Sequence, residues 1–248
     1  MHDPLLIKIS DAIKECGVIL LNADREKMRV DEKGGSANFV TEYDQKSQAF
    51  LYEKLKEILP EAQFIGEEGD QHDALGSGYC FIVDPIDGTT NFIKDYHTSA
   101  ISIGLLKDGK PEIGVIYNPY LDELYTAKRG EGAYCNGKPI RVSDQPLERG
   151  IVLFGTAPYN KTQLGEATFR KAYEYFMKAL DIRRSGSAAL DLCAIAAGRA
   201  ELYFELILSP WDYAAGCLIV EEAGGTVTTM DGEVLTFDKP QSVLAKNR

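Results

Sequence analysis

Acidic residues follow an apolar stretch about a third of the way along the chain. The β-rich stretch 79–83 leads directly into Asp84 and Asp87, with Pro85 between them and Gly88 after them. A short, continuous apolar run predicts a strand that is covered on both faces, and Pro85 and Gly88 are expected to end it within a few residues. Carboxylates at a strand end beside a glycine turn are typical of the sites where α/β proteins carry out their chemistry.

Two further acids have a similar position. Glu67 follows the short apolar strand expected at 64–65, and Asp212 lies at or near the N-cap of the last predicted helix. Each is also explained as an ordinary acidic turn or as a capping carboxylate. If they converge with Asp84 and Asp87 in a partly buried pocket, the four carboxylates repel one another. A divalent cation relieves that repulsion, and oxygen ligands without His or Cys favour Mg²⁺, with Mn²⁺ as the substitute.

A threonine and a further aspartate would complete a hydrolytic site. Two metal ions can clamp a phosphate ester and polarise a water molecule for in-line attack. Gly88 and Thr89, which are expected to open a helix, offer backbone N–H groups to the phosphate oxygens. Thr89 is placed to hydrogen-bond the attacking water, and Asp44 is the candidate that orients the threonine or takes the proton. The pattern therefore predicts a metal-dependent phosphatase.

The elements that position these residues follow from periodicity and turn signals. Apolar residues at helical spacing predict a helix over 5–20, after an N-cap and first-turn proline at Asp3 and Pro4. A charged hairpin or loop is expected at 26–36, and Thr41 or Asp44 opens a second helix that runs from 45 to 58. Hairpin signals separate three strands of an antiparallel meander, at 100–106, 114–117 and 123–127.

The second half of the chain alternates between strands and helices. We expect strands at 149–155 and 201–206, and helices at 164–180 and 188–197. The last helix begins at 209–216, and its small residues allow close packing. The whole chain, 1–248, is expected to form a single domain with approximate lobes 1–148 and 149–248.

Composition restricts the class of protein. A chain of 248 residues with 44% hydrophobic residues can bury a full core. The absence of a long apolar run and of a signal-peptide pattern predicts a cytoplasmic protein without a membrane partner. The five scattered cysteines give little support to a disulfide framework or a thiolate zinc site, and the three histidines have no paired-ligand spacing. A formal net charge of -11 argues against a general nucleic-acid binder.

Three separate motifs resemble the inositol monophosphatase family of magnesium-dependent, lithium-sensitive sugar and polyol phosphatases. The motifs occupy 66–68, 84–92 and 211–216, and weaker matches accompany them in the same order at 38–44, 114–119, 136–140 and 186–190. The resemblance implies an α/β (α+β) fold, the layered α-β-α-β-α sandwich of the inositol monophosphatase and fructose-1,6-bisphosphatase type. It also implies a homodimer.

The resemblance assigns a role to each matching residue. The first metal ion would be bound by Glu67, Asp84 and the carbonyl of Ile86, and the second by Asp84, Asp87 and Asp212. A weaker third ion would involve Glu67 and water molecules. The catalytic set is Asp44, Thr89 and Glu67. The substrate-binding set comprises Lys33, on a loop close to the site, Gly88 and Thr89, and, toward the alcohol part of the substrate, Gly186, Ser187, Ala188 and Glu205.

Several substrates stay open. Thr90, Asn91 and Phe92, together with Glu205, favour a neutral polyol or sugar phosphate, with inositol monophosphate first. Fructose 1,6-bisphosphate and 3'-phosphoadenosine 5'-phosphate are the alternatives from the same superfamily. The adjacent basic residues 183–184 either bind a second phosphate or form a solvated basic pair.

Two other readings compete with this one. A phosphatase of the haloacid dehalogenase type needs its two aspartates two residues apart, whereas Asp84 and Asp87 are three apart with Pro85 between them. A non-catalytic, metal-dependent binding or regulatory protein would not need Thr89 and Asp44. The chain also departs from the family at two places, Ser209, where animal members have histidine, and residues 246–248, where many members continue into a terminal helix. We expect these departures to affect substrate preference and terminal packing.

Overall fold

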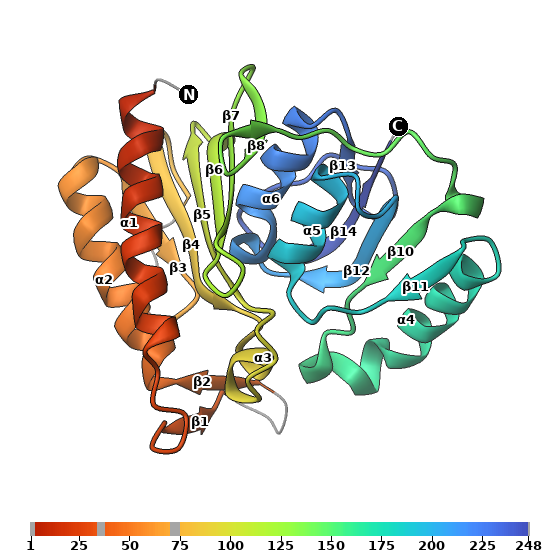
Figure 1. Ribbon diagram of the computed structural model, residues 1–248, viewed down its shortest axis with the longest axis horizontal. Helices are drawn as coiled ribbons and strands as arrows, with labels where there is room; N and C mark the ends of the chain where they lie inside the picture. The colour runs from red at the N-terminus through yellow and green to blue at the C-terminus, as the bar shows by residue number, and fades with distance from the viewer. Residues whose placement is uncertain (1–2, 34–37, 70–74, 248) are drawn as a thin grey trace.

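The computed structural model describes residues 3–33, 38–69 and 75–247, and its elements stack in layers (Figure 1). A pair of helices covers one face of a seven-stranded sheet, and a second pair lies between that sheet and a five-stranded sheet. A single helix covers the outer face of the five-stranded sheet. This order confirms the predicted α-β-α-β-α sandwich.

The outer helix pair consists of α1 (Pro4–Leu21) and α2 (Glu42–Ile58). Asp3 caps α1 by accepting hydrogen bonds from the first turn, and Thr41 caps α2, as the sequence predicted. Between them, β1 (Val30–Glu32) pairs antiparallel with β2 (Phe39–Thr41), which makes the expected charged segment a hairpin. Residues 34–36 of that expectation lie outside the described residues.

The seven-stranded sheet has the order β3-β4-β5-β6-β7-β8-β9. Its first pair is parallel and the others are antiparallel, which confirms the expected meander. The strands are β3 (Gln63–Gly66), β4 (Tyr79–Asp87), β5 (Ala100–Lys107), β6 (Lys110–Asn118), β7 (Glu123–Lys128), β8 (Gly132–Cys135) and β9 (Lys138–Pro139).

Strand β4 is longer than the sequence indicated, because Pro85 does not end it. Asp84 pairs with Ser102 and Asp87 with Ala100, so the register shifts between the two aspartates. Pro85 and Ile86 on β4 then face the single residue Ile101 on β5, and two residues opposite one is the arrangement of a β-bulge. Proline is tolerated at bulges because it needs no ladder hydrogen bond. Residues three apart on a regular strand point to opposite faces. The bulge changes that alternation between the two carboxylates.

The central helices are α5 (Ala188–Ala196) and α6 (Pro210–Glu222), and both lie between the sheets (Figure 1). Helix α6 approaches the seven-stranded sheet closely, because a Cβ atom on Gly114 would lie 2.6 Å from the carbonyl oxygen of Ala215. A Cβ atom on Gly216 would lie 2.5 Å from Leu192 on α5. The small residues of α6 therefore permit the close packing that the sequence indicated.

The five-stranded sheet has the order β11-β10-β12-β14-β13. Its first three strands are parallel, and β14 runs antiparallel to both neighbours. Helix α4 (Lys161–Phe176) covers the outer face; it begins and ends earlier than the expected 164–180. The strands are β10 (Ile151–Phe154), β11 (Asp181–Arg183), β12 (Leu202–Leu208), β13 (Thr226–Thr228) and β14 (Gln241–Lys246), and short 3-10 turns occupy Leu147–Arg149 and Pro158–Asn160.

One cluster of buried apolar side chains joins the two halves of the sequence. It contains Ile82 and Ile116 from the seven-stranded sheet, Leu192 and Ile219 from the central helices, and Val243 from the five-stranded sheet. This shared core is compatible with a single domain; the division into lobes at residue 148 stays a prediction. Among the helices of the described residues, none has both the length and the apolar character to cross a membrane.

Candidate active site

Three aspartates meet where β4 ends beside the N-terminus of α6. Asp84, Asp87 and Asp212 each offer one carboxylate oxygen, and these atoms all lie within 4.8 Å of one another. Glu67, just past the end of the neighbouring strand β3, lines the same pocket, which has a volume of about 410 Å³. The structure therefore brings together the four acids that the sequence singled out.

The electrostatics of this cluster suit a bound cation. Burial raises the pKa of Asp84 well above its ordinary value, and repulsion from Glu67, Asp87 and Asp212 adds to the shift. Burial likewise raises the pKa of Asp87 to about 7 and that of Asp212 well above its ordinary range. Buried carboxylates that resist ionisation are stabilised as anions by a positive charge among them. An all-oxygen donor set fits a hard divalent cation.

Asp87 is held by the N-terminus of α5. Its carboxylate accepts hydrogen bonds from the hydroxyl of Ser187 and from the N–H groups of Ala188, at 3.3 Å, and Ala189, at 2.8 Å. These bonds lower the pKa of Asp87, but burial outweighs them. Ser187 and Ala188, which the resemblance assigns to the substrate, also line the pocket. In this structure they donate to Asp87, so their contact with a substrate stays a prediction.

The N-cap of α6 is Ser209, and Asp212 is the third helical residue, near the N-cap as the sequence indicated. Oδ2 of Asp212 accepts a hydrogen bond from the backbone N–H of Ser209 at 2.7 Å, in a capping box. Pro210 explains why Ser209 is the cap, because proline favours the first helical position and the cap must then precede it. One carboxylate oxygen thus fixes the helix start while the same group joins the acidic cluster.

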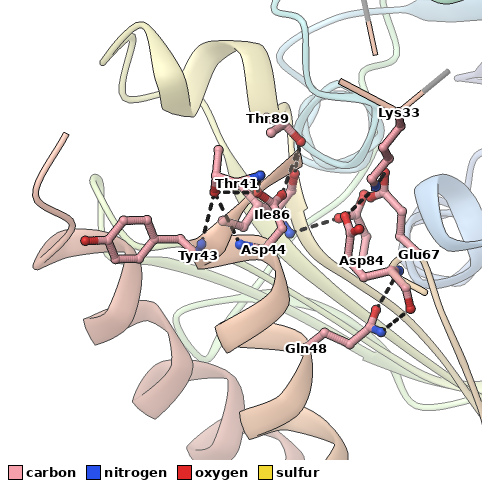
Figure 2. A network of polar contacts seen from close by, with 10 residues as sticks. Lys33, Thr41, Tyr43, Asp44, Gln48, Glu67, Asp84, Ile86 and Thr89 are labelled. Atoms are coloured by element: carbon pink, nitrogen blue, oxygen red, sulfur yellow. Dashed lines mark hydrogen bonds and ion pairs between the residues drawn. The ribbon is translucent and has the colours of Figure 1, made fainter. Parts of the chain in front are cut away.

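Thr89 and Asp44 lie side by side, close to Asp84 of the cluster (Figure 2). Gly88, in the left-handed conformation with φ 87°, precedes the short helix α3 (Thr89–Ile93). The hydroxyl of Thr89 lies 3.3 Å from Oδ1 of Asp44 and 3.2 Å from the carbonyl oxygen of Ile86. Either oxygen can accept its single proton, and the threonine oxygen can still accept a hydrogen bond from a water molecule.

Asp44 is buried and firmly oriented. Its Oδ2 accepts hydrogen bonds from the N–H of Thr41, at 2.7 Å, and from the Thr41 hydroxyl, at 2.6 Å. Burial raises the pKa of Asp44 to about 6, and the charge of Glu67 adds to the shift, while the bonds from Thr41 oppose it. A carboxylate with such a pKa can exchange a proton near neutral pH.

Lys33 lies against two carboxylates. Its Nζ is 3.1 Å from Oε1 of Glu67 and 2.5 Å from Oε1 of Glu68 (Figure 2). Burial alone would lower the pKa of Lys33, but the two glutamates outweigh it and raise that pKa. The lysine is therefore close to the acidic cluster, as expected, and its contact with a substrate stays a prediction.

The far side of the pocket is formed by the segment that follows β10 and by Glu205. The Glu205 carboxylate accepts hydrogen bonds from the N–H of Ala157, at 2.9 Å, and from the Tyr203 hydroxyl, at 2.8 Å. A Cβ atom on Gly155 would lie 1.8 Å from Oε2 of Glu205, so only glycine leaves room for this carboxylate. Gly186 also lines the pocket.

The side chains of the adjacent arginines 183 and 184 lie in different surroundings. Arg183 is exposed and pairs with Asp181 of its own strand. Arg184 donates a hydrogen bond to the hydroxyl of Thr156 at 3.1 Å and lines the pocket. Only Arg184 is therefore placed to reach a substrate.

Some residues that line the pocket were not predicted from the sequence. They include Thr156 and Tyr159 in the segment after β10, and Asp191 on α5, which is buried with no partner for Oδ2 among the described residues. The glycine directly after the strand 151–154 was an available signal, since such a glycine often marks a close approach of the backbone to another group. A lone aspartate in an apolar helix was another.

Among the described residues, no histidine or cysteine joins this site. His97 is exposed and its ring lies 3.1 Å from Asp95, and His2 and His72 lie outside the described residues. All five cysteines fall within the described residues, and none of them is in a disulfide there.

The layered fold and this site define a phosphatase that hydrolyses phosphoric monoesters. The chain belongs to the inositol monophosphatase family, because the family model matches residues 2–248. It is 41% identical to Nus factor SuhB of Vibrio cholerae over 235 residues, which cover 94% of this chain and 87% of that protein. It is 38% identical to inositol-1-monophosphatase of Bacillus subtilis over 242 residues, covering 95% and 89%.

A solved structure agrees with the fold. The extragenic suppressor protein suhB from Bartonella henselae superposes with a TM-score of 0.91 at 36% identity. The match covers 98% of this chain and 93% of that protein. The family is metal-dependent, which agrees with the acidic cluster.

Proposed function

We propose that this phosphatase hydrolyses inositol monophosphate, or a closely similar neutral polyol or sugar phosphate, with Mg²⁺ as its ion and Mn²⁺ as a substitute. The observation that carries the proposal is the position of the Thr89–Asp44 pair beside the cluster of Asp84, Asp87 and Asp212. A pure binding protein has no use for that pair. The name of the Bacillus subtilis relative supports the choice of inositol phosphate.

The proposed ligands form two metal sites that share Asp84. Glu67, Asp84 and the carbonyl oxygen of Ile86 would hold the first ion, and Asp84, Asp87 and Asp212 the second. Glu67 would also take part in a weaker third site. When bound, the ions polarise the phosphoryl group and lower the pKa of a water molecule.

The chain itself positions and deprotonates the attacking water. The water would donate a hydrogen bond to the Thr89 hydroxyl, which would donate its own proton to Oδ1 of Asp44, 3.3 Å away. Because Thr41 holds the other oxygen of Asp44, the pair is fixed in one orientation. A proton can then move from the water through Thr89 to Asp44 as the phosphate ester is attacked.

The substrate would lie across the pocket from Gly88 to Glu205. The backbone N–H groups of Gly88 and Thr89 are proposed to hold phosphate oxygens. Gly186, Ser187, Ala188 and Glu205 would meet the alcohol, where carboxylate and backbone groups can pair with hydroxyls. Lys33, whose Nζ lies 3.1 Å from Glu67, is proposed to contact the substrate from the side of the pocket where the metal ions bind.

Relative kcat/KM tests the substrate. We expect phosphate release at saturating Mg²⁺ to be most efficient with inositol monophosphate, compared with fructose 1,6-bisphosphate and 3'-phosphoadenosine 5'-phosphate. A preference for the bisphosphate that is lost in Arg184→Ala would favour the alternative in which Arg184 binds a second phosphate. Release from none of a broad panel of sugar and polyol phosphates would favour the non-catalytic alternative. Inhibition by Li⁺ is expected in the same assay.

The proposal also includes the partners of the chain. We infer a homodimer from the family resemblance, and light scattering coupled to gel filtration measures the oligomer. A cytoplasmic location stays a prediction. Nus factor is the name of the Vibrio cholerae relative. The net charge of -11 argues against general binding of nucleic acid by this chain, because a negative surface repels phosphate groups. Saturable binding of labelled RNA at physiological salt would contradict that inference.

A further inference from the structure

Gln48 on α2 makes two hydrogen bonds with the backbone of a single residue, Glu68. Its Oε1 accepts from the N–H of Glu68 at 2.8 Å, and its Nε2 donates to the carbonyl oxygen of Glu68 at 2.5 Å. In Figure 2 this side chain reaches from the helix to the backbone beside Glu67. The peptide planes before and after Glu68 are therefore both held by one side chain.

Glu67, a proposed metal ligand, directly precedes Glu68 in the chain. The N–H of Glu67 donates to the carbonyl oxygen of Val83 on β4 at 3.1 Å. The peptide on one side of Glu67 is thus held by β4 and the peptide on the other side by Gln48. Two fixed peptide planes define φ and ψ of the residue between them, and with them the direction in which the Glu67 side chain leaves the backbone.

Helix α2 supports both parts of the site from one face. Asp44 and Gln48 are four positions apart, which places them one above the other on a helix. Asp44 reaches Thr89, and Gln48 reaches the backbone of Glu68. The helix therefore sets the distance between the proposed water-orienting pair and the proposed metal ligand.

The side chain at this position has to be an amide. Glutamine carries one acceptor oxygen and one donor nitrogen on the same group, whereas glutamate offers only acceptors when ionised. A Cβ atom on the neighbouring Gly66 would lie 2.3 Å from Oε1 of Gln48, so glycine is needed there for the amide to fit.

We propose that Gln48 is a positioning residue that orients Glu67 for the metal ion, an inference that rests on the metal-dependent function proposed above. Gln48 acts through the backbone of Glu68 and does not touch the reacting atoms. Removing an outer partner of a metal ligand commonly weakens metal affinity about 10- to 100-fold. The loss is expected in metal affinity, while the rate at saturating metal is kept.

The test compares three variants of the full chain. Gln48→Met removes both hydrogen bonds and keeps the length of the side chain. Gln48→Glu keeps the acceptor but places a second acceptor against the Glu68 carbonyl. Gln45→Met makes the same change at an exposed position of the same helix and is the control. Calorimetry gives the Kd for Mg²⁺, and phosphate release across a Mg²⁺ titration gives kcat and the half-saturating concentration.

We expect Gln48→Met to raise the Kd for Mg²⁺ about 10- to 100-fold, Gln48→Glu to raise it as well, and Gln45→Met to leave it unchanged. At saturating Mg²⁺, kcat of both Gln48 variants should stay within a few-fold of the wild type. Gly66→Ala, which displaces the amide from the other side, should also weaken Mg²⁺ binding.

Two outcomes would overturn the inference. The first is a lower melting temperature of the metal-free Gln48 variants with an unchanged Kd for Mg²⁺, which is the signature of a purely structural role. The second is a loss of kcat that excess Mg²⁺ does not restore. If Gln48→Met does not fold, Gln48→Glu and Gly66→Ala decide the question. A wild-type protein that neither binds Mg²⁺ nor releases phosphate would instead refute the proposed function.

Discussion

The hydroxyl of Thr89 lies 3.3 Å from a carboxylate oxygen of Asp44, although 45 positions separate the two residues in the sequence. Thr41 holds the other oxygen of Asp44 through its N–H and its hydroxyl. The carboxylate cannot turn away from Thr89 without losing both of those bonds. The threonine is therefore presented to the pocket in a defined orientation.

Removing the hydroxyl of Thr89 should abolish most of the turnover. Positioned proton transfer contributes about 10²- to 10⁴-fold to a rate, so kcat of Thr89→Ala should fall within that range. Thr89→Ser, which keeps the hydroxyl, should retain most of the activity, and the Kd for Mg²⁺ should be unchanged in both. A Thr89→Ala enzyme within threefold of the wild-type kcat would exclude Thr89 from the reaction.

Asp87→Asn should separate activity from stability. One ligand charge is lost, so turnover should drop by orders of magnitude. The metal-free variant should be at least as resistant to urea as the wild type, because one of several mutually repelling carboxylates is gone. Near-normal turnover, or clear destabilisation without metal, would count against the proposed place of Asp87.

The stability of the metal-free protein should depend on pH through the same residue. Asp87 has a pKa of about 7 in the folded chain, against about 3.9 when unfolded. A raised folded pKa gives stability that is fully present below the unfolded value and is lost as the pH rises through the folded value. In chelator, the melting temperature should therefore fall between about pH 4 and pH 7.

The Asp87→Asn variant is the control for this effect. Its melting temperature should fall less steeply over the same pH range, and the remaining slope reports other groups such as Asp44, whose pKa is also raised. Identical slopes in the two proteins would show that Asp87 does not titrate as the structure indicates.

Magnesium should stabilise the folded chain. A ligand that binds only the native state adds about 2.7 kcal/mol at a concentration 100 times its Kd. Differential scanning calorimetry with increasing Mg²⁺ should show a rising melting temperature, reversed by chelator, and a smaller rise in Asp84→Asn. A melting curve that does not move at high Mg²⁺ would argue against the acidic cluster as an ion site.

Gly155→Ala should be destabilising. The added methyl group would overlap Oε2 of Glu205, and overpacking of this kind costs about 1–3 kcal/mol. Gly165→Ala on α4 is the matched control, because nothing lies within 4 Å of its added Cβ, and it should stabilise the helix by about 0.5–1 kcal/mol. Urea unfolding of both variants measures the difference. If the free energy of unfolding of Gly155→Ala equals that of Gly165→Ala, the Glu205 side chain moves aside at no cost.

Local patterns were sufficient for part of the fold. Helices α1 and α2 and the meander were predicted because helical periodicity, N-caps and hairpin turns are set by neighbouring residues. The short strands β13 and β14 were not predicted, since Thr226–Thr228 and Gln241–Lys246 become strands only by pairing with each other and with β12. Strand β4 was underestimated because a proline was taken as its end, and the bulge was not foreseen.

The candidate site also has a part that the sequence predicted and a part that it did not. The acids at 67, 84, 87 and 212 were predicted from their places at the ends of apolar elements. Their supporting contacts were not, because Ser187 is 100 positions from Asp87, and Gln48 is 20 positions from Glu68. The pairing of Thr89 with Asp44 was proposed from the need for a proton acceptor, and the structure places the two groups within hydrogen-bonding distance.

The residue before Asp212 gives the protein an optical reporter of its own. Trp211 is the single tryptophan of the sequence, and it lines the pocket while its neighbour Asp212 joins the acidic cluster. Indole emission depends on the charge and polarity around the ring. Excitation at the tryptophan band therefore reads the occupancy of this one pocket without a label, and stopped-flow mixing can follow the arrival of an ion or a phosphate in real time.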